Sequence, residues 1–191
     1  MDLNSWMIIG AYFLGSLPFG LLIGLGVKGV DVRETGSGNI GASNVSRACG
    51  VGWGRLTLLL DALKGALPVA VALSISEEVA PAVGLAAILG HCFPVWLGFH
   101  GGKGVATTAG AVGVIAPQAM GVAVAIWWAG HRLTGISAVG SLAACVALIA
   151  ALWGLEPEGL RLGVAAVALV VLRHRENIQR LWEGTENQSR F

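Results

Sequence analysis

Most of this chain consists of apolar runs that are long enough to cross a lipid bilayer as helices. A transmembrane helix needs about 20 predominantly apolar residues, and four runs reach that length: 5–27, 54–75, 79–98 and 134–153. Charged residues make up only 12% of the sequence, against 55% hydrophobic residues, which is far more apolar than a soluble domain. The sequence therefore predicts an all-α polytopic membrane protein.

Two further apolar regions leave the number of segments open. Residues 105–129 form either one span or a hairpin of two short helices that is broken at Ala116-Pro117-Gln118. Each half of such a hairpin contains only about twelve residues, which is below the usual length of a spanning helix. Residues 159–172 form another short apolar segment near the end of the chain.

The distribution of charge favours the hairpin. With a hairpin, one side of the membrane receives Lys28, Arg33, Arg47, Lys103, Arg132, Arg173, Arg175, Arg180 and Arg190. The other side receives Glu77, Glu78, Glu156 and Glu158. A single span would move the arginine-rich C-terminal stretch to the acidic side, against the tendency of Lys and Arg to lie in the cytoplasm. We therefore expect seven transmembrane helices, with the N-terminus outside and the C-terminus cytoplasmic.

Other features limit the class of protein. The three cysteines, Cys49, Cys92 and Cys145, lack the spacing of a zinc site or a disulfide framework, so we expect free thiols and no metal. A net charge of +1 predicts no nucleic-acid surface. No Lys or Arg precedes the first apolar run, so we expect that run to be retained rather than cleaved as a signal peptide. Without repeats or linkers, residues 1–191 are expected to form a single integral membrane domain.

A glycine-rich loop with one lysine interrupts two apolar segments. Gly101, Gly102 and Gly104 leave the backbone free to present N–H groups, while Lys103 adds a positive charge. Such a loop is suited to holding a phosphate at a membrane edge, although an ordinary turn between two spans has the same composition. The loop lacks the spacing of a nucleotide-binding Walker motif, because Leu97 stands where that motif needs Gly.

The predicted topology brings two more polar stretches to the side of the lysine loop. The first, GSGNIGASNVSR at 36–47, has donors and glycines at Gly36, Ser37, Gly38, Asn39, Ser43, Asn44 and Arg47. These residues suit a phosphate or acyl-phosphate oxygen, and a flexible connection is the alternative. In the second stretch, His174 and Asn177 are three residues apart and share one face of a helix. His174 is a candidate proton acceptor or, alternatively, a surface cation near lipid headgroups.

Two charged residues fall inside an apolar segment. A charged side chain near the centre of a bilayer costs roughly 2.5–3.5 kcal/mol on insertion scales, so Asp61 and Lys64 need a partner. Their spacing places them on one face of a helix, where they can pair with each other. We therefore predict a buried structural ion pair rather than a direct role in catalysis.

Four stretches together carry a resemblance to a known family. GSGNIGASNVSR, LDALKGALP, GHCFPVWLGFHGGKGVATT and HRENIQRLWEGTE, in this order, resemble the bacterial acyl-phosphate-dependent glycerol-3-phosphate acyltransferases, the PlsY family. Ser43 stands where Thr is more usual in that family, which keeps the hydroxyl. The resemblance implies acyl transfer from acyl phosphate to the sn-1 hydroxyl of glycerol 3-phosphate, in phospholipid biosynthesis, yielding lysophosphatidic acid and phosphate.

The resemblance also implies roles for individual residues. Ser37 and Arg47 match the family's catalytic serine and arginine, His174 and Asn177 match its catalytic C-terminal pair, and Glu186 matches a structural glutamate. The lysine loop, with Lys103, would bind glycerol 3-phosphate. We expect the active site to face the cytoplasm from the bacterial inner membrane, with membrane lipid around it.

The implied reaction demands little additional chemistry from the protein. An acyl phosphate is already activated, so we expect no cofactor, and either His174 or a substrate phosphate oxygen accepts the proton. The HxxxxD pattern of acyl-CoA-using glycerophosphate acyltransferases is absent. The competing interpretation is a small membrane transporter or channel for phosphorylated metabolites, which would more naturally show repeated halves and a binding site near the midplane.

Overall fold

The computed structural model describes residues 2–189, which fold almost entirely into helices and contain no strand. The α-helices are α1 (Leu3–Gly15), α2 (Phe19–Lys28), α3 (Ala42–Cys49), α4 (Val51–Ile75), α5 (Ala80–Cys92), α6 (Val105–Ile115), α7 (Pro117–Thr134), α8 (Ser137–Leu155), α9 (Leu160–Arg173) and α10 (Arg175–Trp182). Short 3-10 turns lie at Val32–Glu34, Val95–Leu97 and Pro157–Gly159. The all-α prediction is therefore confirmed for the described part of the chain.

Each of the seven predicted segments is occupied by helix. Four stretches are long and apolar enough to cross a membrane by length and composition: Leu3–Lys28, Val51–Ile75, Ala80–Leu97 and Ser137–Leu155. The expected hairpin is present as two helices, because α6 ends at Ile115 and α7 begins at Pro117. The number of helices that cross the bilayer and the orientation of the termini stay predictions.

The first predicted segment, 5–27, differs from expectation, because it is two helices rather than one. α1 ends at Gly15 and α2 begins at Phe19. Pro18 carries no backbone N–H and cannot continue the helical ladder. The Lys64 ammonium group donates to the carbonyl of Leu17 at 2.8 Å, and the same oxygen accepts the N–H of Phe19 at 3.1 Å. A side chain from α4 thus stabilises the interruption.

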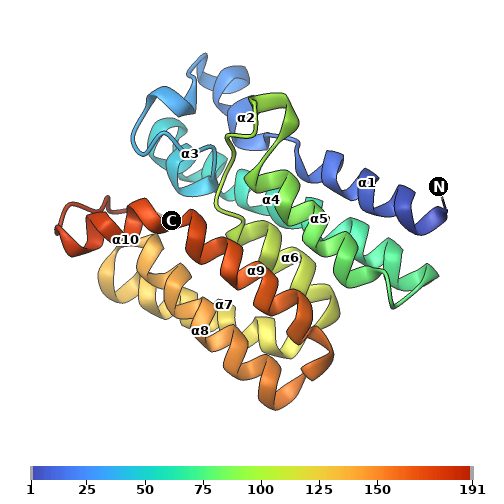
Figure 1. The fold of residues 1–191 in the computed structure, drawn as a ribbon. Helices are drawn as coiled ribbons and strands as arrows, with labels where there is room; N and C mark the ends of the chain where they lie inside the picture. Colours follow the sequence, from blue (N-terminus) through green and yellow to red (C-terminus); the bar gives the residue numbers. More distant parts are fainter. Residues whose placement is uncertain (1, 190–191) are drawn as a thin grey trace.

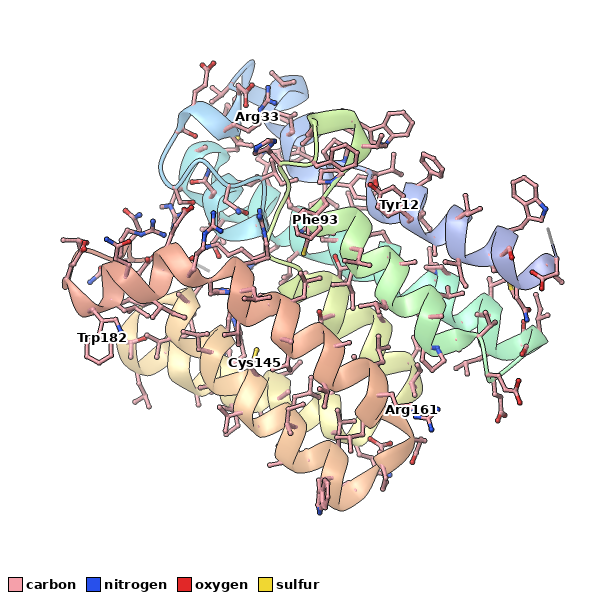
Figure 2. All side chains as sticks on the ribbon, in the orientation of Figure 1. Tyr12, Arg33, Phe93, Cys145, Arg161 and Trp182 are labelled. Carbon is pink, nitrogen blue, oxygen red and sulfur yellow. The ribbon has the colours of Figure 1, made fainter. Side chains whose placement is uncertain are left out.

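Glycines bring helix backbones into direct contact, as the small-residue composition predicts. A Cβ atom at Gly15 would overlap the backbone of Ala87, and one at Gly90 would overlap the backbone of Tyr12, so α1 lies directly on α5. The Tyr12 hydroxyl donates to the carbonyl of Phe93 at 2.8 Å across the same interface, and Figure 2 labels both residues. This contact fixes the point where α5 ends and the lysine loop begins.

Polar and charged residues gather at the two ends of the helix bundle. In Figure 1, α3 and α10 lie at the left of the view and α2 lies near the top, while the N-terminus lies at the right. Arg161, near the start of α9, lies at the end opposite Trp182 of α10 (Figure 2), so the segregation of charge is incomplete. Arg190, which the charge argument counted, lies outside the described residues.

Three of the charged residues that the sequence singles out have defined structural partners. Asp61 and Lys64 form the predicted ion pair at 2.8 Å, with side chains only 4% and 1% exposed. Glu156 is also buried, and its carboxylate accepts a hydrogen bond from the backbone N–H of Ala119 at 2.8 Å, in the first turn of α7. The cysteines at 49, 92 and 145 are free and buried, as expected.

Candidate active site

A polar cavity of about 120 Å³ opens where the three polar stretches converge. Nine of the residues that the sequence singled out line it: Ser37, Asn39, Ser43, Asn44, Arg47, Lys103, Gly104, His174 and Asn177. Four other predicted residues, Gly36, Gly38, Gly101 and Gly102, are not among its lining residues. The convergence expected from topology is therefore present, and the four glycines need a different account.

The loop before α3 is held in shape by Asn44, which is 1% exposed. Its amide donates to the carbonyls of Val32 at 2.7 Å and Thr35 at 3.0 Å, and its oxygen accepts the N–H of Ser37 at 3.0 Å. Gly36 has a φ of 56°, and a Cβ there would overlap the Asn44 side chain. The hydrogen-bonding capacity of Asn44 is therefore used largely within the loop, which makes it a brace for the cavity wall.

Arg47 projects from α3 between this loop and the C-terminal segment. Its Nη2 atom donates to the Ser37 hydroxyl at 3.2 Å, and its Nη1 atom donates to the carbonyl of Gln188 at 3.3 Å. The Nε atom is buried and has no hydrogen-bond partner among the described residues. Burial lowers the pKa of Arg47 below its usual value, although guanidinium remains charged at neutral pH. The group therefore offers a fixed positive charge at the cavity.

The backbone of Gly101 and Gly102 is already hydrogen-bonded within the protein. Their N–H groups donate to the carbonyls of Cys92 at 3.2 Å and His91 at 3.0 Å. Arg173 donates to the carbonyls of Gly101 at 2.8 Å and Gly102 at 3.0 Å. The expectation that these two amides face a substrate phosphate therefore does not match the structure. Their backbone groups instead hold the loop that follows α5 against the end of α5 and against Arg173 at the end of α9.

The residues that follow these glycines form the cationic wall of the cavity. Gly104 adopts a φ of 84°, a conformation that favours glycine, and α6 begins at Val105. The first N–H groups of a helix have no carbonyl partner within it, so this helix start is suited to an anion. Burial lowers the pKa of Lys103 to about 8, while the charge of Glu186 opposes that shift.

His174 and Asn177 also line the cavity, with His174 between α9 and α10 and Asn177 in α10. His174 is 2% exposed, and its Nδ1 atom lies 2.8 Å from the carbonyl of Val170. Because a carbonyl can only accept, Nδ1 carries the hydrogen, and Nε2 is the nitrogen that can take a proton. Burial and the charge of Lys103 lower the pKa of His174 to about 4. The Asn177 Oδ1 atom is buried without a hydrogen-bond partner among the described residues.

Several lining residues were missed as site residues by the sequence argument. Asp61 of α4 and His91 of α5 line the cavity, as do Glu186 and Ser189 of the C-terminal segment. Glu186 accepts a hydrogen bond from Arg180 at 2.8 Å, consistent with the structural role that the resemblance implied. A polar residue inside an apolar segment is a signal of function. His91 lies in the apolar run 79–98, so that signal could have identified it as a site residue.

A second, apolar cavity of about 280 Å³ adjoins the polar one. The two cavities share five lining residues: Leu58, Val105, Ala106, Trp127 and Ser141. Small and aliphatic side chains of α4, α6, α7, α8 and α9 form the rest of its wall, including Cys145, which Figure 2 labels. A molecule with a charged head and a long apolar tail fits this pair of cavities.

Comparison with known proteins gives a consistent result. The family model described as glycerol-3-phosphate acyltransferase matches residues 5–184. The glycerol-3-phosphate acyltransferase of Anaeromyxobacter dehalogenans is 45% identical, with 97% of each chain covered. That of Myxococcus xanthus is 44% identical, with 97% of this chain and 100% of the relative covered.

Two solved structures have the same fold. One is PlsY, an integral membrane glycerol 3-phosphate acyltransferase, in its glycerol 3-phosphate form, with a TM-score of 0.92 and 38% identity over 98% of this chain and 96% of that chain. The other is the lysophosphatidic acid form of PlsY, with a TM-score of 0.90 and 38% identity over 98% and 95% of the two chains.

Proposed function

The chain belongs to the glycerol-3-phosphate acyltransferase family, and we propose that its acyl donor is an acyl phosphate. The protein is a membrane acyltransferase of phospholipid biosynthesis that acylates glycerol 3-phosphate to lysophosphatidic acid. The observation that carries the donor assignment is the direct junction of a cationic cavity with an apolar one. A small phosphorylated head and a long acyl tail occupy such a junction with the reacting carbonyl between them.

Two phosphate groups must be bound during this reaction, and two cations, Arg47 and Lys103, line the polar cavity. We assign the phosphate of glycerol 3-phosphate to Lys103 and the start of α6, because the unpaired N–H groups there complement an anion. We assign the phosphate of the donor to Arg47, whose contact with Ser37 holds the guanidinium beside the cavity. Charge-assisted hydrogen bonds of this kind contribute roughly 1.5–3 kcal/mol each.

The acyl tail is assigned to the apolar cavity. Its wall contains Ala109, Ala123, Ala144 and Leu148, which offer no hydrogen-bonding side chain. The shared rim near Ser141 then holds the acyl carbonyl close to the cationic cavity. Burying the tail between helices keeps it out of water, where exposing each methylene costs roughly 0.8 kcal/mol.

The chemical step follows from this arrangement. The sn-1 hydroxyl oxygen attacks the acyl carbonyl carbon, the bond from that carbon to the phosphate oxygen breaks, and inorganic phosphate leaves. We propose that Nε2 of His174 accepts the hydroxyl proton, with a substrate phosphate oxygen as the alternative acceptor. Asn177 Oδ1 is a buried acceptor on the same wall, suited to orient a glycerol hydroxyl. Positioning and charge stabilisation supply the remaining rate enhancement.

The orientation in the membrane is a further part of the proposal. We place the protein in the bacterial inner membrane with the polar cavity facing the cytoplasm. The basic residues Lys28, Arg33 and Arg132 lie in the segments that flank this end of the bundle, which agrees with the preference of Lys and Arg for the cytoplasmic side. A transporter is disfavoured because the cavity lies at one end of the bundle rather than at its centre.

Turnover of a synthetic long-chain acyl phosphate by the purified protein tests the donor assignment. Incubation with glycerol 3-phosphate should yield lysophosphatidic acid and inorganic phosphate in equal amounts, measured by mass spectrometry and a phosphate assay. A parallel incubation with the acyl-coenzyme A of the same chain length should yield little product. Comparable turnover with acyl-coenzyme A, in a preparation free of phosphotransacylase, would contradict the proposed donor.

A further inference from the structure

A buried histidine lies directly beneath the lysine loop. His91, in the last turn of α5, is 4% exposed and has no assigned part in the chemical step. A Cβ atom at Gly102 would overlap the His91 imidazole, and the three atoms nearest to it all belong to that ring. The φ of Gly102 lies outside the left-handed region. The histidine ring is therefore the feature that excludes a side chain at Gly102.

The neighbouring glycines are constrained differently. At Gly101, a Cβ would overlap the backbone carbonyl of His91 and the ring of Pro94, neither of which a change of the His91 side chain removes. Gly104 is constrained by its φ of 84°. Gly102 alone among these three thus reports on the position of the His91 side chain.

His91 is itself supported by the buried ion pair. Its Nδ1 atom lies 3.6 Å from Oδ1 of Asp61, the same oxygen that pairs with Lys64 at 2.8 Å. Lys64 in turn donates to Leu17 at the break between α1 and α2. A continuous line of polar groups therefore connects that break to the underside of the lysine loop.

The distance between His91 and Asp61 is slightly longer than a hydrogen bond. Nδ1 is buried and has no hydrogen-bond partner among the described residues, and leaving a buried donor or acceptor unpaired is unfavourable. A small shift of the ring toward Asp61 would bring Nδ1 within hydrogen-bonding distance of that carboxylate.

We propose that His91 is a positioning residue for the binding of glycerol 3-phosphate. Its ring supports Gly102 and thereby sets the direction in which the adjacent Lys103 enters the polar cavity, while Asp61 orients the ring. The inference rests on the proposed assignment of Lys103 to the glycerol 3-phosphate phosphate. That phosphate does not react, so its contacts act on substrate and transition state alike, and their loss raises KM more than it lowers kcat.

A double-mutant cycle between His91 and Gly102 tests this contact. Gly102→Ala should raise the KM for glycerol 3-phosphate because the new methyl group displaces the loop. His91→Ala should also raise it, because the loop loses its support. The double variant should show a lower KM than Gly102→Ala alone, since the overlap is removed, with a coupling of roughly 3- to 100-fold.

Gly101→Ala, with and without His91→Ala, is the matched control. It should show no such recovery, because its overlap is with backbone and Pro94. Additive effects of Gly102→Ala and His91→Ala would overturn the proposal, as would a His91→Ala variant that lowers only thermal stability and leaves this KM unchanged. If the alanine variants do not fold, His91→Gln serves as a milder change: a raised KM with a smaller effect on kcat supports the proposal, and an unchanged KM overturns it.

Lys103→Ala, measured alongside, separates this inference from the assignment of the loop. An unchanged KM for glycerol 3-phosphate in that variant would refute the phosphate assignment itself. If Lys103→Ala raises this KM but the effects of His91→Ala and Gly102→Ala are additive, only the positioning role of His91 is refuted. Because the donor phosphate is assigned to Arg47 rather than to Lys103, the KM for the donor should change much less in every variant.

Discussion

The Nδ1–H group of His174 donates to the carbonyl of Val170, and this single contact determines which imidazole nitrogen is available for chemistry. Val170 belongs to the last turn of α9, so the helix itself selects the tautomer. The second nitrogen is left without a proton in the neutral ring. A general base needs a free lone pair of this kind close to the reacting hydroxyl.

Replacement of His174 by alanine should therefore lower kcat by about 10²–10⁴, the usual range for loss of a general base. The KM for glycerol 3-phosphate should change much less, because Lys103 and α6 remain in place. Steady-state kinetics of the folded variant measure both quantities. A near-normal kcat would indicate that a substrate phosphate oxygen, rather than His174, accepts the proton.

The pH dependence of kcat gives an independent test of the same role. Burial and the charge of Lys103 lower the pKa of His174 to about 4, so the base is neutral and active above that value and is lost as the pH falls through it. Bound phosphates carry negative charge and raise this pKa in the complex. We expect an acid limb in the kcat profile above pH 4 that is absent in His174→Gln, provided that chemistry is rate-limiting. An identical limb in the variant would contradict the assignment.

Lys103 should produce an alkaline limb in kcat/KM for glycerol 3-phosphate. Its pKa of about 8 means that the ammonium is charged below that pH and is lost above it. The substrate phosphate becomes a dianion above about pH 6, so binding should be strongest between these two values. Lys103→Arg should lack the alkaline limb, because guanidinium stays charged. The measurement is kcat/KM over a pH series at low substrate concentration. An alkaline limb at the same pH in Lys103→Arg would contradict the assignment of that limb to Lys103.

Sequence reasoning predicted those parts of the fold that depend on local pattern. The hairpin break near Pro117 follows from a residue that cannot continue a helix, and the Asp61–Lys64 pair follows from charge and helical spacing. The complete break before Phe19 was not predicted. It is stabilised by the bond from Lys64 to Leu17, and that contact exists only once α4 packs against α1.

The candidate site was likewise predicted only in part from the sequence. Arg47, Lys103 and His174 were found because charged or titratable residues stand in polar stretches on one side of the predicted membrane. The use of the Gly101 and Gly102 amides was not predictable, because it depends on where the last carbonyls of α5 fall. Such tertiary contacts leave no trace in residue spacing.

The apolar cavity predicts a specific effect on donor use. Ala144→Phe should fill part of the cavity and strongly reduce turnover of long-chain acyl phosphate, with a smaller loss for a short-chain donor. Val146→Phe, on the same helix but 74% exposed on the outer surface, is the matched control and should retain activity. Equal losses for both chain lengths in Ala144→Phe would argue against a tail in this cavity.

The topology leads to a prediction that does not depend on catalysis. Native Cys49 lies on the predicted cytoplasmic side, but it is buried, and so are Cys92 and Cys145. A test therefore needs exposed positions, and Glu34 and Glu158 provide an acidic, exposed pair at opposite ends of the bundle.

With the N-terminus outside, a cysteine at Glu158 should react with a membrane-impermeant maleimide in intact cells. A cysteine at Glu34 should react only after the membrane is permeabilised. Both variants should be labelled equally after solubilisation in detergent, which controls for the reactivity of each thiol. Because the two positions share side-chain type and exposure class, a difference between them reports the side of the membrane. Labelling of Glu34→Cys but not Glu158→Cys in intact cells would invert the orientation and place the polar cavity outside the cytoplasm.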